Sequence, residues 1–322
     1  MKAAVYYETG GPEVFRYQDV PDPVCGPDLV MVEVRAISIE GGDTLHRAGG
    51  MMAGRPHIVG YQCAGIVREV GANVIDRVPG QRVVAAMMYG SHAELAVVPA
   101  ATTWVLPDGL DLKLGACVPI PFGTADDCLF EFGRLRAGET ALIHAGAGGV
   151  GIAAIQLAKR AGATVLATAS SDTKLERLKK FGLDHGINYR TTNFVTAVHE
   201  LTAGHGADVI VDSVGGHTLE GSIAALAYRG RIAYVGSAGR DAYQPNLDAL
   251  RPGNKTITGI FLGAEMMLHH GRVHPMIAGH LADIARGALR VAIDREFPLA
   301  EAAAAHAYVE SRQAFGRVLL VP

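Results

Sequence analysis

The sequence predicts an α/β protein with two domains, a β-rich domain followed by a doubly wound parallel-sheet domain. The chain has 322 residues, more than one ordinary hydrophobic core organises. Its first third alternates short runs rich in Val, Ile and Tyr with turn residues, which is typical of antiparallel strands. From about residue 123 strand-like runs alternate with helical stretches, as in βαβ units.

Composition narrows the possible partners and the compartment. Hydrophobic residues make up 49% and charged residues 19%, which favours a globular chain over a disordered one. A net charge of -3 without basic or acidic blocks indicates neither nucleic acid nor membrane, so we expect a small-molecule ligand. The four cysteines form no C-x-x-C pair and the N-terminus has no apolar signal region, so we expect a cytoplasmic protein: Cys25, Cys63, Cys117 and Cys128.

The elements of the two regions follow from the same patterns. Strands are expected at 2–8, 13–20, 29–39, 60–71, 81–88 and 92–98, and then at 140–145, 163–169, 207–213 and 231–236. Helices are expected at 150–162, 171–182 and 217–230. Residues 295–322 read as a helix and one more strand, which either extends the parallel sheet or returns to the first domain.

The strongest local motif is the G-x-G-x-x-G of Gly146, Gly148 and Gly151. A buried strand ends at this loop and an apolar-periodic helix begins near Val150, which is the context of a dinucleotide-binding loop. A pyrophosphate reaches the backbone amides of a helix N-terminus only where no side chain intervenes. We therefore expect Gly146, Gly148, Gly149, Val150 and Gly151 to bind a cofactor; the alternative is a tight turn without a ligand.

The end of the next strand indicates which cofactor binds. An NAD site places Asp or Glu there, whereas this strand ends in Ser170 and Ser171, with Asp172 beyond its tip. Small hydroxyls leave room for a 2′-phosphate, and Lys174 and Arg177 follow one helical turn later. This favours NADPH over NADH, although both cations could belong to a solvated helix face.

With these motifs in place, the whole chain resembles the medium-chain dehydrogenase/reductase superfamily, and specifically its zinc-free quinone oxidoreductase (zeta-crystallin-like) group. The residues that carry the resemblance are the HAGAGGVGIAAIQLAK loop and helix, the ATASSDTKLERLKKFGLDHGINY stretch, DVIVDSVGG, GRIAYVGSAG and the terminal FGRVLLVP. The resemblance implies a GroES-like catalytic domain at 1–122, a Rossmann cofactor domain at 123–289, and a segment 290–322 that returns to the catalytic domain.

The same resemblance implies roles for further residues. Ser170, Lys174 and Tyr189 would contact the adenosine 2′-phosphate. Around the nicotinamide it implies four residues: Thr124, Gly236, Ser237 and Phe261. It also implies a homodimer, and the apolar run 255–263 would otherwise be a long free edge strand.

A catalytic zinc needs three protein ligands of the Cys, His or carboxylate type. Zinc alcohol dehydrogenases place a cysteine in the stretch that here is 38–43, a histidine where this chain has Tyr61, and a second cysteine near 121–124. None of these ligands is present, so we expect no metal. The alternative is an improvised site drawn from Glu40, Asp43, His46 and His57.

The chain also departs from the quinone oxidoreductase pattern N-x-x-D-T-Y, because it has Glu40 and Leu45 at the first and last positions while Asp43 and Thr44 match. A carboxylate at 40 could stabilise a cationic nicotinamide ring or relay a proton, or it could be a solvated helix N-cap residue. Tyr61, like Tyr89, could donate a hydrogen bond to the substrate or simply pack.

We therefore take Glu40, Tyr61 and Thr124 as candidate catalytic residues. The predicted function is an NADPH-dependent reductase that transfers hydride to a quinone or another electron-poor enone without zinc. One alternative is an enoyl- or acryloyl-thioester reductase of the same superfamily. Another is a structural or adaptor protein that binds the cofactor without turnover, because a fold does not fix a function.

Overall fold

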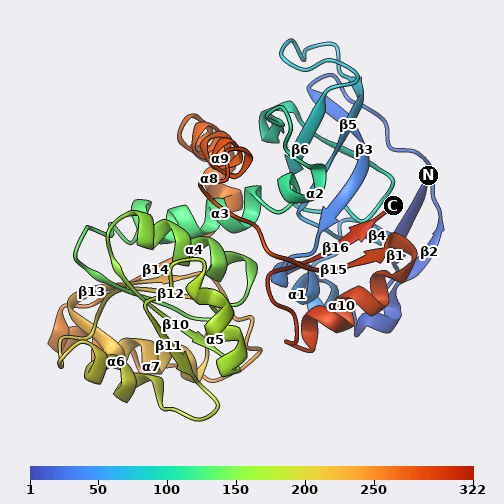
Figure 1. The fold of residues 1–322 in the computed structure, drawn as a ribbon. Coiled ribbons are helices and arrows are strands. Elements are labelled where there is room, and N and C mark those ends of the chain that lie inside the picture. The colour runs from blue at the N-terminus through green and yellow to red at the C-terminus, as the bar shows by residue number, and fades with distance from the viewer. The chain divides into compact units, whose positions relative to one another are not determined.

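The computed structural model describes all 322 residues as two compact units, which Figure 1 draws in one ribbon. The first unit comprises Met1–Ile120 and Gly263–Pro322, and the second comprises Pro121–Leu262. These bounds differ from the sequence-based domains, which extend the cofactor domain to residue 289. Residues 263–285, which lie in the helices Leu262–Leu268 and His270–Ala285, group with the first unit, and their helical pattern alone carries no sign of that.

The first unit contains two sheets. The smaller sheet has the order β2-β1-β4, and the larger has the order β15-β16-β3-β5-β6-β8, with β7 also pairing β3. All pairs are antiparallel except β15 with β16. The bounds are β1 Lys2–Tyr6, β2 Arg16–Asp19, β3 Leu29–Ser38, β4 His57–Ile58, β5 Gln62–Val70, β6 Arg82–Ala86, β7 Leu95–Pro99, β8 Thr103–Val105, β15 Ile293–Pro298 and β16 Arg317–Val321.

The helices of this unit lie mostly outside the sheets' shared core. They are α1 Gly41–Gly49, α2 Leu112–Gly115, α8 Leu262–Leu268, α9 His270–Ala285 and α10 Ala302–Glu310, with short 3-10 turns at Pro12–Val14, Ala100–Thr102 and Leu299–Glu301. Inward residues of β3, β5, β6 and β16 form one apolar core, and Ala302 and Ala305 of α10 pack into it. The C-terminal strand β16 therefore joins the sheet of the first unit, next to β3.

The second unit is a six-stranded parallel sheet in the order β11-β10-β9-β12-β13-β14. The strands are β9 Thr140–Ile143, β10 Thr164–Ala169, β11 His185–Asn188, β12 Ala207–Asp212, β13 Leu226–Tyr234 and β14 Thr256–Gly259. The crossover helices α4 Gly149–Arg160 and α5 Asp172–Lys179 lie on one face of the sheet, and α6 Phe194–Leu201 and α7 His217–Ala225 lie on the other (Figure 1). This is the doubly wound order of a Rossmann fold, which confirms the predicted fold class.

The remaining elements of the second unit are the helices α3 Pro119–Asp126, α4 Gly149–Arg160, α5 Asp172–Lys179, α6 Phe194–Leu201 and α7 His217–Ala225, a π-helical turn at Asp127–Glu131 and a 3-10 segment at Leu247–Gly253. Strand order reverses between β9 and β12. The carboxyl ends of these two strands mark the point where doubly wound sheets bind their ligands.

Three sequence-based expectations are wrong in detail. The helix expected over 217–230 ends at Ala225, because Leu226 already pairs with Ala207 of β12. The run 255–263 is not a long strand: β14 has four residues, and α8 begins three residues after it. The C-terminal region contains a strand, β15, before its helix.

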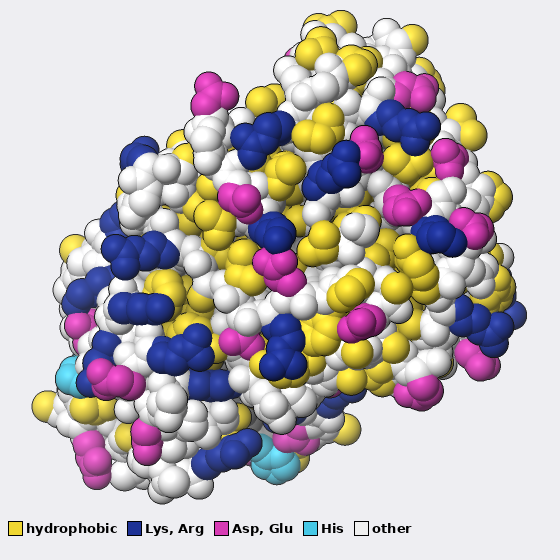
Figure 2. Space-filling view, turned by 45° about the vertical axis from the view of Figure 1, so that its right-hand side comes forward, with side chains coloured by type: hydrophobic (Ala, Val, Ile, Leu, Met, Phe, Trp, Pro, Cys, Tyr) yellow, Lys and Arg dark blue, Asp and Glu magenta, His cyan; other side chains and the backbone are white.

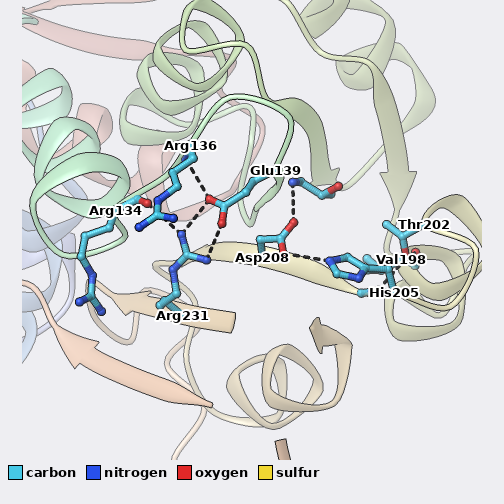
Figure 3. A network of polar contacts seen from close by, with 10 residues as sticks. Arg134, Arg136, Glu139, Val198, Thr202, His205, Asp208 and Arg231 are labelled. Carbon is cyan, nitrogen blue, oxygen red and sulfur yellow. Dashed lines mark hydrogen bonds and ion pairs between the residues drawn. The ribbon is translucent and has the colours of Figure 1, made fainter. Parts of the chain in front are cut away.

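A network of polar contacts lies near the amino ends of β9 and β12 (Figure 3). The guanidinium of Arg231 donates to both carboxylate oxygens of Glu139, at 3.0 and 2.8 Å. Asp208 accepts from the backbone amide of Thr140 at 2.8 Å and lies 2.9 Å from Nε2 of His205. Since the network is at the opposite edge from the glycine loop, we assign it to the stability of the sheet.

No helix has the length and apolar character needed to cross a membrane. On the face drawn in Figure 2, basic and acidic side chains are interspersed among hydrophobic ones, in keeping with the small net charge.

Candidate cofactor and catalytic site

The glycine loop connects β9 to α4 at the carboxyl edge of the parallel sheet. Gly148 is the N-cap residue of α4, with extended backbone angles of φ -84° and ψ 176°, and no side chain caps the helix. The amides of Gly149, Val150 and Gly151 are the first of the helix, where intrahelical acceptors are lacking. The loop therefore offers backbone donors and the positive end of a 12-residue helix to an anion.

The three glycines of the motif differ in what they make possible. A Cβ at Gly146 would lie 2.9 Å from Cβ of Ala167, and one at Gly151 would lie 2.5 Å from the carbonyl oxygen of Ala145. At both positions the packing of the protein itself therefore leaves no room for a side chain. A Cβ at Gly148 would meet only that same carbonyl oxygen, at 3.3 Å. Packing is therefore less restrictive at 148 than at 146 or 151, although the carbonyl of Ala145 would have to give by a few tenths of an ångström. A glycine there also leaves room for a ligand to approach the backbone, which is compatible with a phosphate cradle.

The residues expected at the 2′-phosphate follow two neighbouring strands. Ser170 comes after β10, and Tyr189 comes after β11, which pairs with β10 in parallel. The amide of Tyr189 donates to the carbonyl oxygen of Ala169 at 3.2 Å, so Tyr189 lies beside Ser170. Lys174 is in the first turn of α5, which begins directly after this edge. The structure thus brings all three candidates to one corner of the sheet.

Two neighbours of this corner were not expected to have the roles that the structure gives them. Ser171 is the N-cap residue of α5, and its Oγ accepts from the amide of Lys174 at 3.3 Å. The carboxylate of Asp172 accepts from the side-chain amide of Asn188 at 3.0 Å. Asp172, the acid nearest to this corner, therefore already accepts a hydrogen bond from the protein.

The candidates for the nicotinamide end also follow strands of the second unit. Gly236 and Ser237 come after β13 rather than ending it, and Oγ of Ser237 lies 2.7 Å from the hydroxyl of Tyr234. Phe261 follows the adjacent strand β14 and is 59% exposed. Thr124 is buried in α3. Ser237 and Phe261 therefore lie along the same carboxyl edge as the glycine loop.

Glu40 lies in the first unit as the N-cap residue of α1, and it is almost completely buried. Its Oε1 accepts from Nε2 of Gln62 and from Nη2 of Arg317, and its Oε2 accepts from Nη1 of Arg317 at 3.1 Å. The N-cap alternative is thus right about position, but the expectation of a solvated side chain is wrong, because β16 delivers Arg317 to it.

Arg317 and Gln62 connect Glu40 to several elements. Nε of Arg317 donates to Oγ of Ser38 at 2.8 Å, and its Nη2 donates to the carbonyl oxygen of Ile39. The side-chain oxygen of Gln62 accepts from the backbone amide of Ile120 at 3.0 Å. We call Glu40, Gln62, Arg317 and Ser38 the Glu40 cluster. It joins β3, α1, β5 and β16 through a buried ion pair.

The titration of this region is governed by burial. Burial raises the pKa of Glu40 to about 7, while Arg317 opposes the rise. Burial also raises the pKa of Asp43 well above its ordinary value, and the hydrogen bond that Asp43 accepts from the amide of Glu40 opposes that rise. Tyr61 has a raised pKa as well, first through burial and then through Asp43 and Glu40. Tyr61 is therefore a neutral phenol at neutral pH.

Tyr61 lies directly against the first turn of α1. A Cβ at Gly42 would be 2.4 Å from Cε2 of its ring and 3.1 Å from its hydroxyl oxygen. The absence of a side chain at 42 therefore gives Tyr61 its place beside Glu40 and Asp43. Tyr89, the other tyrosine considered, is half-exposed, with its ring 5.5 Å from that of His57.

The four residues of the improvised metal site have other partners. Nε2 of His46 lies 2.6 Å from the carbonyl oxygen of Met51, and Nδ1 of His57 accepts from the amide of Ala53 at 3.2 Å. No three His, Cys, Asp or Glu side chains of the chain are arranged so that they could hold a metal ion.

Sequence reasoning missed Arg317, although a signal was present. An arginine opening the apolar run RVLLV is a charge in a buried strand, and such charges are normally paired. The partner could not be identified from spacing, because 277 residues separate Arg317 from Glu40.

The comparisons with known proteins agree with this architecture. Residues 26–108 match the family model described as alcohol dehydrogenase GroES-like domain, and residues 149–277 match the one described as zinc-binding dehydrogenase. The chain is 35% identical to a 2-haloacrylate reductase of Burkholderia sp., over 99% of this chain and 98% of that protein. It is 36% identical to a quinone oxidoreductase of Pseudomonas aeruginosa, over 97% of each.

Among solved structures, a mycobacterial protein in complex with NADPH superposes with a TM-score of 0.94, at 33% identity over the whole of both chains. Fold, glycine loop and matches together define an oxidoreductase built from a GroES-like unit and a Rossmann unit. Within that class, the chain belongs to the medium-chain dehydrogenase/reductase superfamily and to its quinone oxidoreductase group.

Proposed function

We propose that this protein is an NADPH-dependent reductase that delivers hydride to a quinone or another electron-poor enone without zinc. The observation that carries the proposal is the corner at the ends of β10 and β11. There Ser170, Lys174 and Tyr189 gather, and the nearest acid, Asp172, is engaged by Asn188. A hydroxyl and a cation suit a 2′-phosphate, whereas NAD sites present a carboxylate to the ribose.

The remaining cofactor contacts follow from the same edge of the sheet. The amides at the N-terminus of α4 would bind the pyrophosphate. Gly236, Ser237, Phe261 and Thr124 would line the nicotinamide end, as the family resemblance implies. Bound NADPH would supply the hydride, and the protein's part is to orient the cofactor and exclude water.

Tyr61 is the substrate-side donor that we propose. Its hydroxyl stays protonated at neutral pH and would donate a hydrogen bond to the carbonyl oxygen on which charge develops. Glu40 has a different part in this proposal. Because its charge is shared with Arg317, little of it is left for a cationic ring, so we assign Glu40 to holding α1, and with it Tyr61, in place.

The family name includes zinc, but the residues present do not fit that metal. A catalytic zinc takes three Cys, His or carboxylate ligands. Here Tyr61 and Gln62 occupy the G-H-E stretch, Gln62 is bonded to Glu40 and Ile120, and Glu40 is paired with Arg317. We therefore propose a reaction in which polar side chains stabilise the substrate oxygen.

A second candidate substrate class is an activated alkene conjugated to an acid or thioester. The similarity to a 2-haloacrylate reductase favours it, since that protein's name describes reduction of an electron-poor alkene. The two classes share the hydride acceptor carbon and differ in the group that Tyr61 would contact.

One screen tests the proposal. Purified protein is mixed with NADPH or NADH and with benzoquinone, 2-chloroacrylate or an enoyl-CoA, and loss of the reduced cofactor's absorbance is followed. In a parallel assay a primary alcohol is mixed with NADP⁺ or NAD⁺, and the gain of that absorbance is followed. We expect turnover with NADPH and one of the first three compounds. Oxidation of the alcohol restored by zinc after chelation would contradict the proposal. Tight NADPH binding without turnover of any acceptor would favour an adaptor protein.

A further inference from the structure

Four buried polar side chains lie directly beneath the glycine loop, all within the second unit. His144 follows β9, Thr168 lies in β10, Asp212 ends β12, and Ser222 is in α7. Each is at most 2% exposed. Since β10, β9 and β12 are neighbours in the sheet, the four residues span the point at which the strand order reverses.

The distances define one continuous chain of hydrogen bonds. Oγ1 of Thr168 lies 3.0 Å from Nδ1 of His144, and Nε2 of His144 lies 3.0 Å from Oγ of Ser222. Oγ of Ser222 donates to Oδ2 of Asp212 at 2.8 Å. The contacts run from β10 through β9 and α7 to β12.

The number of hydrogen atoms on these side chains determines which group donates and which accepts in each of the hydrogen bonds. Ser222 has one hydroxyl hydrogen, and two acceptors face it: the carboxylate of Asp212 at 2.8 Å, which is the stronger, and the carbonyl oxygen of Thr218 at 3.0 Å. Neither of them has a hydrogen to donate back. His144 must then carry its hydrogen on Nε2 and donate it to Ser222. Nδ1 is left as an acceptor, which the hydroxyl of Thr168 satisfies. Burial lowers the pKa of His144, with Asp212 opposing, so the imidazole is neutral.

The two ends of the chain hold the backbone on both sides of the loop. Thr168 bonds His144 through its side chain and accepts from the amide of Gly146 through its carbonyl oxygen, at 2.9 Å. Ala145 lies between His144 and Gly146 and has a φ of 49°. This left-handed backbone conformation is unfavourable for a residue with a side chain unless contacts with neighbouring residues hold it. At the other end, Oδ1 of Asp212 accepts from two amides of the turn that leads into α7.

The hydrogen-bonded series of four side chains is shielded from solvent and is not a nucleophilic triad. The ring of Phe194 meets the imidazole of His144 edge to face, with centroids 4.8 Å apart. A Cβ at Gly221 would lie 2.4 Å from Cζ of Phe194, so the glycine beside Ser222 is what allows this cover. Asp212 bonds the serine and not the imidazole, and the serine is completely buried, which excludes a Ser-His-Asp nucleophile.

We propose that the chain Thr168–His144–Ser222–Asp212 is a positioning device that fixes the left-handed turn at Ala145 and thereby presets the glycine loop for the pyrophosphate of NADPH. This inference rests on the proposed function. Because its four side chains are buried, we do not expect them to contact the cofactor. They act through the backbone of residues 145–151.

The test compares Thr168→Val with Thr168→Ser. Valine keeps the shape and removes the hydroxyl, whereas serine keeps the hydroxyl and removes a methyl group. A lost internal hydrogen bond predicts that Thr168→Val raises the dissociation constant of NADPH about fivefold to tenfold, with kcat at saturating NADPH unchanged. Thr168→Ser should bind like wild type. Wild-type affinity in Thr168→Val, or an equal loss in Thr168→Ser, would overturn the inference.

A second measurement is independent of how the variants fold. Nitrogen-15 spectra of histidine-labelled wild-type protein should show His144 as a neutral ring with its hydrogen on Nε2. A hydrogen on Nδ1 would reverse the chain and contradict the inference. Wild-type protein that does not bind NADPH would contradict the proposed function, whereas NADPH binding that is equal in wild type and both variants contradicts the positioning role alone.

Discussion

The burial of Glu40 predicts that the first unit loses stability as the pH rises through neutrality. Burial raises the pKa of this carboxyl from 4.5 to about 7, and Arg317 offsets part of the effect. A folded-state pKa above the unfolded value means that the folded state binds the proton more tightly. The stabilisation is therefore fully present below the unfolded pKa and is lost as the pH passes the folded one. A shift of this size corresponds to about 3 kcal/mol.

Replacing Glu40 with Gln removes this titration and keeps the size of the side chain. Between about pH 5 and about pH 8, the unfolding free energy of the wild type should fall by about 2 to 3 kcal/mol more than that of the variant. Urea denaturation followed by tryptophan fluorescence measures this unit specifically, because the chain's one tryptophan, Trp104, is buried in β8. Glu8→Gln, at an exposed carboxylate of the same unit, is the matched control and should parallel the wild type.

Asp43 titrates in the same direction and remains in both proteins. Because the charge of Glu40 is one of the causes of its raised pKa, Glu40→Gln reduces that rise as well, and the difference between the curves reports both carboxyls. Parallel curves for wild type and Glu40→Gln over the whole range would refute the reasoning. They would mean that the charged carboxylate costs nothing in the folded state, and that the pair with Arg317 fully compensates its burial.

Three further predictions concern the proposed site. Lys174→Ala should weaken NADPH binding by about 1.5 to 3 kcal/mol and leave NADH binding nearly unchanged, as calorimetry can show; an equal loss for both cofactors would remove Lys174 from the 2′-phosphate site. Elemental analysis of active protein should find no stoichiometric zinc, and a chelator should not lower turnover. Light scattering at micromolar concentration should give a homodimer, as the family resemblance implies; β14, although only four residues long, is the edge strand of the parallel sheet and the pairing edge that we expect, and a monomer would exclude that pairing.

The parallel sheet was predictable because its signals are local. Each strand is a short apolar run, each helix has its own period, and the glycine loop marks where the first crossover begins. The end of α7 was not predictable in this way. Residues 217–230 carry a helical pattern throughout, yet Leu226 pairs with Ala207 on the neighbouring strand. A partner about twenty residues away decided the conformation, and local propensity was overridden.

The same difference between local signals and distant partners applies to the candidate site. Ser170 was predictable from the end of its strand, and Tyr189 only from the family resemblance. The structure brings them together because residues that follow adjacent parallel strands meet at one edge; their roles stay predictions. The Glu40 cluster was not predictable, because both of the charges that hold α1 come from the far end of the chain. Glu40 at its N-cap pairs with Arg317 of β16, and Arg47 in its last turn pairs with Glu310 of α10 at 2.6 Å.

These two ion pairs give the C-terminal segment a definite function in the first unit. Arg47 is 1% exposed, and 263 residues separate it from Glu310. Buried charges are costly unless they are paired, so α1 would be left with an uncompensated charge at each end if β16 and α10 did not return to it. The segment thus does more than add a strand beside β3. It neutralises both ends of the helix against which Tyr61 lies, and the geometry of the proposed substrate side therefore depends on residues at the end of the sequence.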